Sequence, residues 1–181
     1  MKLINYVLAA TASLLTSATL SAAGTAVTFY GEVSDQTCQA SIEGNTNGIV
    51  LLPTVPANTL ATAGQTSGLT PFKISIKGCT APKADLPIKT KFLGLDVTAG
   101  GNLGNAAAGN NAAKNVAIQI TADSAGTSAV RLNGPTSVSG LVLKNGATSA
   151  SYDFGARYIA EGGSVTAGLV TSVVEYTLSY Q

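Results

Sequence analysis

Short segments in which apolar and polar residues alternate recur along most of this chain. A period of two is the pattern of a β-strand with one buried face. The clearest segments of this kind are 72–76, 116–120, 152–158 and 174–180. Shorter examples are 49–52, 88–92, 129–132 and 141–143.

Turn-forming residues separate several of these segments. Asn133-Gly134 and Asn145-Gly146 supply residues that tolerate positive φ. Many short strands with frequent turns predict an all-β antiparallel sandwich. The segment 99–113 is rich in Gly, Ala and Asn and has no periodicity, so we expect a long surface loop there, with or without a brief helical turn. A phosphate-binding loop is a poor alternative, because no Gly-Lys-Ser/Thr follows its glycines.

The first residues have the pattern of a secretion signal. Lys2 provides the positive end, 4–20 are mostly apolar or small, and 21–23 fit a small-x-small cleavage site. Interspersed Asn, Ser and Thr make this segment too polar and too short for a membrane span. We therefore expect 1–23 to be removed, which leaves about 160 residues, enough for one domain.

Charge narrows the possible partners. The chain has ten basic and nine acidic residues, and one of the basic residues is Lys2 in the expected signal. There is no basic run, which argues against nucleic acid as a partner. Charged residues make up 10% of the chain and apolar residues 45%, against about 25% charged in average proteins. This composition suits a molecule that associates with copies of itself.

Cys38 and Cys79 are the only cysteines. In an exported chain, a single pair predicts a disulfide. The loop that it would close restricts the unfolded chain by about 4 kcal/mol in the entropy model. A redox role lacks the CxxC spacing, and a mixed Cys/His metal site lacks histidine.

The two ends of the expected domain are best interpreted together. The segment 25–33 alternates like a strand directly after the signal, and the apolar-alternating segment 174–180 ends the sequence. In an immunoglobulin-like sandwich, a further strand ordinarily follows and covers that edge. The missing strand and the surplus one predict that 25–33 of one molecule adds to the sheet of the next. A head-to-tail contact of this kind propagates into a fibre.

The same residues also fit a simpler arrangement. Val27, Phe29 and Val33 could form the first strand of their own domain, and Gly31 could mark a β-bulge. Tyr176, Leu178 and Tyr180 could be plain core residues.

Several motifs in their order resemble pilins of the chaperone–usher family, close to the major subunits of type 1 fimbriae. They are Phe-Tyr-Gly-Glu-Val at 29–33 before Cys38, Phe-Lys-Ile-Ser-Ile at 72–76 before Cys79, Phe-Gly-Ala-Arg-Tyr at 154–158, and the closing Tyr-Thr-Leu-Ser-Tyr-Gln at 176–181. Gly168, fourteenth from the end, and the penultimate Tyr180 match the C-terminal signature of that family.

The resemblance implies an incomplete immunoglobulin-like β-sandwich that lacks its last strand, with 24–37 as a donor-strand extension and 38–181 as the pilin domain. It implies that Thr25, Val27, Phe29, Gly31 and Val33 point inward in the donor strand. Gly168, Tyr176, Leu178 and Tyr180 are expected at the acceptor cleft or the chaperone contact.

The same resemblance implies other pilin subunits, a periplasmic chaperone and an outer-membrane usher as partners, with no small-molecule cofactor. The implied role is a structural subunit of adhesive cell-surface fimbriae, exported through the periplasm. This chain departs from many members of that family, because few residues lie between its expected cleavage site and Thr25.

Other functions fit less well. An enzyme would lack histidine as a base, and the nine acidic residues show no spacing that pairs them. A secreted carbohydrate-binding module would lack tryptophan for stacking on sugars. A minor or adaptor fimbrial subunit is the alternative within the family.

Overall fold

The structure, a computed structural model, describes Phe29 and residues 31–180. The expected signal 1–23, and also Thr25 and Val27, lie outside the described residues. The compact body begins at Glu32. Its elements are β1 (Gln39–Ile42), the 3-10 turn η1 (Ala57–Leu60), β2 (Thr66–Lys77), β3 (Leu86–Gly94), β4 (Leu103–Gly104), β5 (Val116–Thr121), β6 (Thr136–Leu143), β7 (Ser149–Ala160) and β8 (Val174–Ser179).

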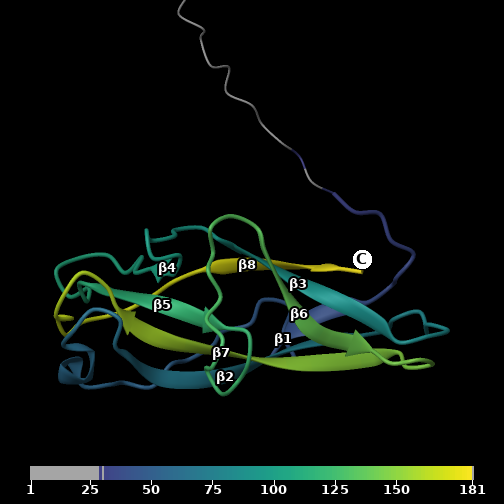
Figure 1. The fold of residues 1–181 in the computed structure, drawn as a ribbon, viewed down its shortest axis with the longest axis horizontal. Helices are drawn as coiled ribbons and strands as arrows, with labels where there is room; N and C mark the ends of the chain where they lie inside the picture. The colour runs from purple at the N-terminus through teal and green to yellow at the C-terminus, as the bar shows by residue number, and fades with distance from the viewer. Residues whose placement is uncertain (1–28, 30, 181) are drawn as a thin grey trace, which may run out of the picture. The chain divides into compact units, whose positions relative to one another are not determined.

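The strands form two antiparallel sheets (Figure 1). One has the order β1-β2-β7-β5-β4 and the other the order β6-β3-β8. The long strands β2 and β7 pair from Thr66 with Ile159 to Lys77 with Ser149, with an irregularity between Ser67 and Thr70. In the smaller sheet, β3 is central and pairs with both β6 and β8. This is the predicted all-β sandwich.

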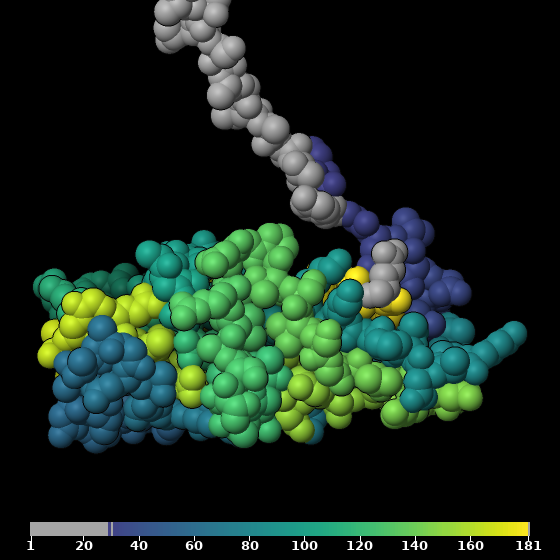
Figure 2. All heavy atoms as spheres, viewed as in Figure 1, coloured from purple at the N-terminus to yellow at the C-terminus, as the bar shows by residue number. Residues whose placement is uncertain are grey.

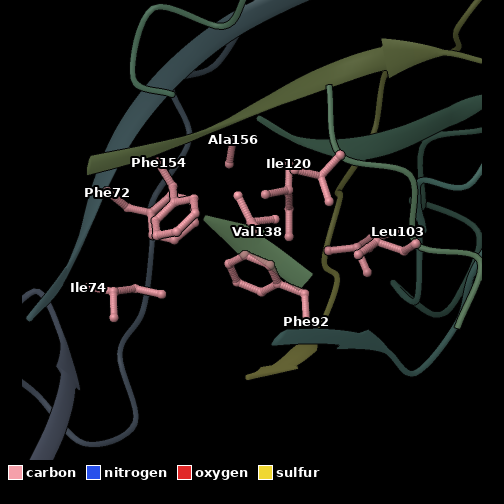
Figure 3. Close-up of a cluster of buried hydrophobic side chains, with 10 residues drawn as sticks. Phe72, Ile74, Phe92, Leu103, Ile120, Val138, Phe154 and Ala156 are labelled. Carbon is pink, nitrogen blue, oxygen red and sulfur yellow. The ribbon is translucent and has the colours of Figure 1, made fainter. Parts of the chain in front are cut away.

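The core lies where the inner faces of the two sheets meet. Phe72 and Phe154 from the larger sheet face Phe92 and Val138 from the smaller one (Figure 3). The ring of Phe154 lies 5.6 Å from that of Phe72, and 5.3 Å from that of Phe92 in an edge-on contact. Edge-on and offset aromatic pairs are favoured by the ring quadrupole. These rings therefore join the sheets at the centre of the sandwich.

Most of the predicted strands are confirmed. The segments 72–76, 88–92, 116–120, 141–143 and 152–158 lie within β2, β3, β5, β6 and β7, and 174–180 contains β8. Gly134 and Gly146 have φ values of 107° and 74°, as expected of the turns that they were predicted to form.

Two expected strands are absent from the described part of the chain. Residues 129–132 alternate correctly, since Val130 and Leu132 are buried. However, the amide of Val130 donates to Ile120, whereas the amide of Leu132 donates to Gly101. A β-strand needs successive hydrogen bonds to the same neighbouring strand, and these two amides bond to different segments. Residues 49–52 make no ladder with another described strand.

The prediction of a surface loop over 99–113 is wrong for residues 101–104. Gly101, Asn102, Leu103 and Gly104 are buried, and Leu103-Gly104 pairs with β5 as the short strand β4. Leu103 belongs to the main core cluster. A single apolar residue among glycines and asparagines carries too little periodicity to show this from sequence.

Candidate functional site

A long groove opens between the free edges of the two sheets. Its volume is about 810 Å³. It runs between β1, an edge strand of the larger sheet, and β8, an edge strand of the smaller sheet. The residues that line it are Gln36, Cys38, Ala40, Ile42, Thr46, Asn47, Gly48 and Val173 to Leu178, together with Tyr180.

The strand β8 forms one wall of the groove. It pairs with β3 from Gly94 with Val174 to Lys89 with Ser179. Within the part of the chain that the structure describes, no strand pairs with its other edge. Unpaired strand edges present free backbone donors and acceptors and tend to recruit another strand. The edge of β8 is therefore available for strand addition.

The side chains of β8, and of Tyr180 directly after it, belong to the core and also line the groove. Tyr176 packs against the central core cluster, and Leu178 and Tyr180 pack against a second cluster around Ile76 and Ile88. All three also line the groove and are only partly buried. Partial burial raises the pKa of the Tyr176 and Tyr180 hydroxyls. The interior of the sandwich is thus open along this edge.

The opposite wall has a similar character. Ala40 and Ile42 of β1 line the groove and pack against the two core clusters. Beyond Gly48, Val50 and Leu52 also pack on the core. The backbone of 46–55 nevertheless makes no backbone hydrogen bond to another described residue. Residues 49–52 therefore keep the alternation predicted for a strand, with Val50 and Leu52 on the core, but have no strand partner among the described residues.

The predicted disulfide is confirmed. Cys38 and Cys79 are bonded, with their Cα atoms 4.1 Å apart. The bond joins the residue before β1 to Cys79, two residues after β2 ends, and Cys38 itself lines the groove. β1 pairs with β2 over only four residues. The disulfide therefore fastens a short edge strand that forms one wall of the groove.

Three of the five residues predicted to form the donor strand are described. Phe29 has 90% of its surface exposed and Val33 100%. A Cβ added to Gly31 would meet no heavy atom within 4 Å. Large apolar side chains left in water forfeit about 1.5–3 kcal/mol each. Phe29 and Val33 are therefore unusual residues to leave uncovered.

Glu32 lies between these residues and makes two specific bonds. Its carboxylate accepts a hydrogen bond from the Ser179 hydroxyl at 2.6 Å and from the Tyr180 amide at 2.8 Å. The bond from the Ser179 hydroxyl contributes most to lowering the pKa of the Glu32 carboxyl. The bond from the Tyr180 amide and the nearby charge of Lys91 lower it further. The base of the N-terminal extension is thus attached to the end of β8. In Figure 2, purple atoms at the start of the compact body lie beside yellow atoms of the C-terminal strand.

The structure does not bring Gly168 to this groove. A Cβ at Gly168 would lie 2.4 Å from the Ala113 amide nitrogen and 2.5 Å from the Asn111 carbonyl. Leu169 next to it forms a parallel bridge with Ala112. Gly168 is therefore required for a close backbone approach at a place that does not line the acceptor groove.

Several residues of the site were missed from the sequence. The strand β1, Gln-Ala-Ser-Ile, is too short and too weakly apolar to stand out. In the sequence, Glu32 resembles any acidic residue on the polar side of a strand, so nothing indicated that it would make a specific contact. Pairing of Glu32 with a residue at the other end of the chain has no local sequence signature.

Among the described residues, no cluster of three or more His, Cys, Asp or Glu side chains is arranged to hold a metal ion. No helix in this same part of the chain is long and apolar enough to cross a membrane.

A β-sandwich with one open edge and an unpaired last strand defines an incomplete immunoglobulin-like fold, the fold of chaperone–usher pilus subunits. Solved structures agree. The P pilus rod subunit PapA superposes with a TM-score of 0.57 at 18% identity, over 78% of this chain and 99% of that one. A chaperone–usher pilus structure that addresses rod uncoiling gives a TM-score of 0.58 at 21% identity, over 91% of this chain and 100% of that one.

Sequence comparison identifies the family. The fimbrial protein family model matches residues 27–181. The F17 fimbrial protein of Escherichia coli is 38% identical over the full length of both chains. The major fimbrial subunit SMF-1 of Stenotrophomonas maltophilia (strain K279a) is 36% identical over 88% of this chain and 94% of its own. The chain belongs to the fimbrial protein family, and it is a structural subunit of fimbriae, not an enzyme.

Proposed function

We propose that this subunit polymerises by donor-strand exchange. In this proposal, residues 25–33 of one copy fill the groove between β1 and β8 of the next. Thr25, Val27, Phe29, Gly31 and Val33 point into the groove, and Tyr176, Leu178 and Tyr180 form part of its wall. The observation that carries the proposal is the groove itself, which exposes core side chains along an unpaired strand.

The chemistry of the two parts is complementary. The groove offers the unpaired edge of β8 on one side and, on the other, residues 46–48, whose backbone makes no backbone hydrogen bond to another described residue. An added strand satisfies such backbone groups with hydrogen bonds, and alternate side chains fill the space between the walls. Phe29 and Val33, exposed in the single subunit, are the apolar groups that such a strand would bury.

Export of a subunit with an open groove needs protection of that groove. An exposed apolar edge aggregates with other edges. We therefore include in the proposal a periplasmic chaperone that lends a strand to the groove and an outer-membrane usher at which the next subunit replaces it. The product is a head-to-tail fibre on the cell surface that supports adhesion.

The fibre role also has an alternative within the family. The minor fimbrial subunit HifD of Haemophilus influenzae is 34% identical over 85% of this chain and 73% of its own. A minor or adaptor subunit would be incorporated sparsely. Deleting this chain abolishes the bulk of the fibre if it is the major subunit and leaves long fibres if it is a minor one.

The substitution Gly31→Leu tests the donor strand. It places a large side chain where the proposal requires none, while an added side chain meets nothing in the subunit itself. We expect normal export and folding, but no fibres in electron micrographs of the cell surface. Thr28→Leu, on the opposite side of the alternating segment, is the matched control and should leave fibres in place. Abundant fibres with Gly31→Leu would refute the assignment.

A further inference from the structure

The contact of Glu32 with its own β8 creates a conflict with strand donation. Glu32 lies between Gly31 and Val33, both of which the proposed function places inside a neighbouring groove. The Ser179 hydroxyl and the Tyr180 amide, which hold the Glu32 carboxylate at 2.6 and 2.8 Å, belong to the same subunit as Glu32. Neighbouring residues in an extended strand are about 3.3 Å apart along its axis. Val33 can therefore enter another subunit deeply only if Glu32 leaves its own.

Ser179 is well suited to hold this carboxylate. Only 3% of its surface is exposed, and its backbone is held by the Lys89–Ser179 pair at the end of the β3–β8 ladder. Tyr180 follows directly and lines the groove. The attachment point of the extension is thus at one end of the acceptor groove.

We propose that the bonds from Ser179 and Tyr180 to Glu32 form a latch that holds the base of the extension on its own subunit until assembly. The latch restrains residues close to the donor strand and must open before Val33 is buried in a neighbour. It slows premature joining of free subunits. This inference rests on the proposed donor-strand function and adds a control to it.

The strength of the latch suits a device that opens. Hydrogen bonds to an ionised group are stronger than neutral ones, but Glu32 is partly exposed and water can replace its partners. We expect removal of the latch to speed assembly by about tenfold, a change of about 1.4 kcal/mol in the barrier.

The test compares four versions of the purified subunit: wild type, Glu32→Gln, Ser179→Ala and Asp35→Asn. Glu32→Gln keeps the shape of the side chain and removes its charge, and Ser179→Ala removes the hydroxyl without altering the extension. Asp35→Asn is the matched control, because Asp35 is an exposed acid of the same extension whose side chain makes no hydrogen bond to another described residue. Self-assembly is followed by light scattering and electron microscopy. Thermal unfolding verifies that each variant is folded.

A second arm separates the latch from the function beneath it. A free peptide of residues 25–33 is added to each subunit, and its binding to the groove is measured. The peptide carries no latch to its own subunit, so its association rate with Glu32→Gln and with wild type should be equal.

The outcomes are distinct. Faster assembly of both Glu32→Gln and Ser179→Ala, with Asp35→Asn as wild type, supports the latch. Wild-type or slower assembly of either latch variant overturns it, since slower assembly would mean that the contact stabilises the fibre. If the peptide binds and the latch variants assemble at the wild-type rate, only the latch fails. If the peptide does not bind any subunit, the donor-strand function fails as well.

Discussion

The energetic weight of the donor strand should be concentrated in Phe29. In the single subunit, 90% of its side chain is exposed to water, and the groove that would receive it has a volume of about 810 Å³ and core side chains in its walls. Complete burial of a phenylalanine contributes about 1.5–3 kcal/mol. Phe29→Ala should therefore lose about 2 kcal/mol of binding free energy, or about 30-fold in affinity.

Calorimetry with synthetic peptides of residues 25–33 measures this loss directly. The Phe29→Ala peptide should bind the subunit about 30-fold more weakly than the natural peptide. Thr28→Ala is the control, because in the alternating pattern of 25–33 Thr28 would point to the opposite side of the proposed strand, and the change should alter the affinity less than threefold. Equal affinities for the Phe29→Ala and natural peptides, or a larger loss with Thr28→Ala, would show that the inward face is assigned wrongly.

Three other predictions concern the body of the subunit. The Thr90 hydroxyl is fully buried and has no hydrogen-bond partner within the described structure, so Thr90→Val should raise the free energy of unfolding in urea by about 1 kcal/mol; a loss of that size would indicate a missed partner. Replacing both Cys38 and Cys79 with alanine should lower the free energy of unfolding by about 4 kcal/mol. An unchanged urea midpoint would contradict the role given to the disulfide. The amide of Thr127 is the first of several donors that lower the pKa of Asp123 from 3.8 to about 2. Because the folded pKa is depressed, the stability that Asp123 contributes is complete above pH 4 or so and is lost as the pH falls through about 2; NMR titration of its carboxyl group should show this midpoint, and one near 4 would refute it.

The sequence was most informative where a strand is long and packs on one face. The alternation in β2 and β7 reflects a real division between Phe72 or Phe154 inside and polar residues outside, so it predicted these strands correctly. β5 shows the limit of that logic. Ala117 and Gln119, on its polar side, are buried as well: the Gln119 amide donates to the Asn102 side chain and accepts hydrogen bonds from the Arg157 guanidinium, so a polar residue is satisfied while buried.

The candidate site was predictable in part. The unpaired β8 followed from comparing the last strand with the expected sandwich topology, and the disulfide from the compartment and the cysteine count. The other wall was not predictable, because β1 has only one large apolar residue, Ile42, and its position depends on a long-range disulfide. Gly168 was expected near the cleft, but its close approach to the backbone of 111–113 is a packing requirement elsewhere.

The central claim is that a single copy leaves its interior open and that a neighbour closes it. A density map of the assembled fibre, at a resolution that traces the backbone, tests this most directly. We expect residues 25–33 of one subunit to lie along β8 of the next, with Phe29 and Val33 inside the groove and Gly31 between them. A map in which 25–33 folds back into the groove of its own subunit, or in which the groove is empty within the fibre, would contradict the account.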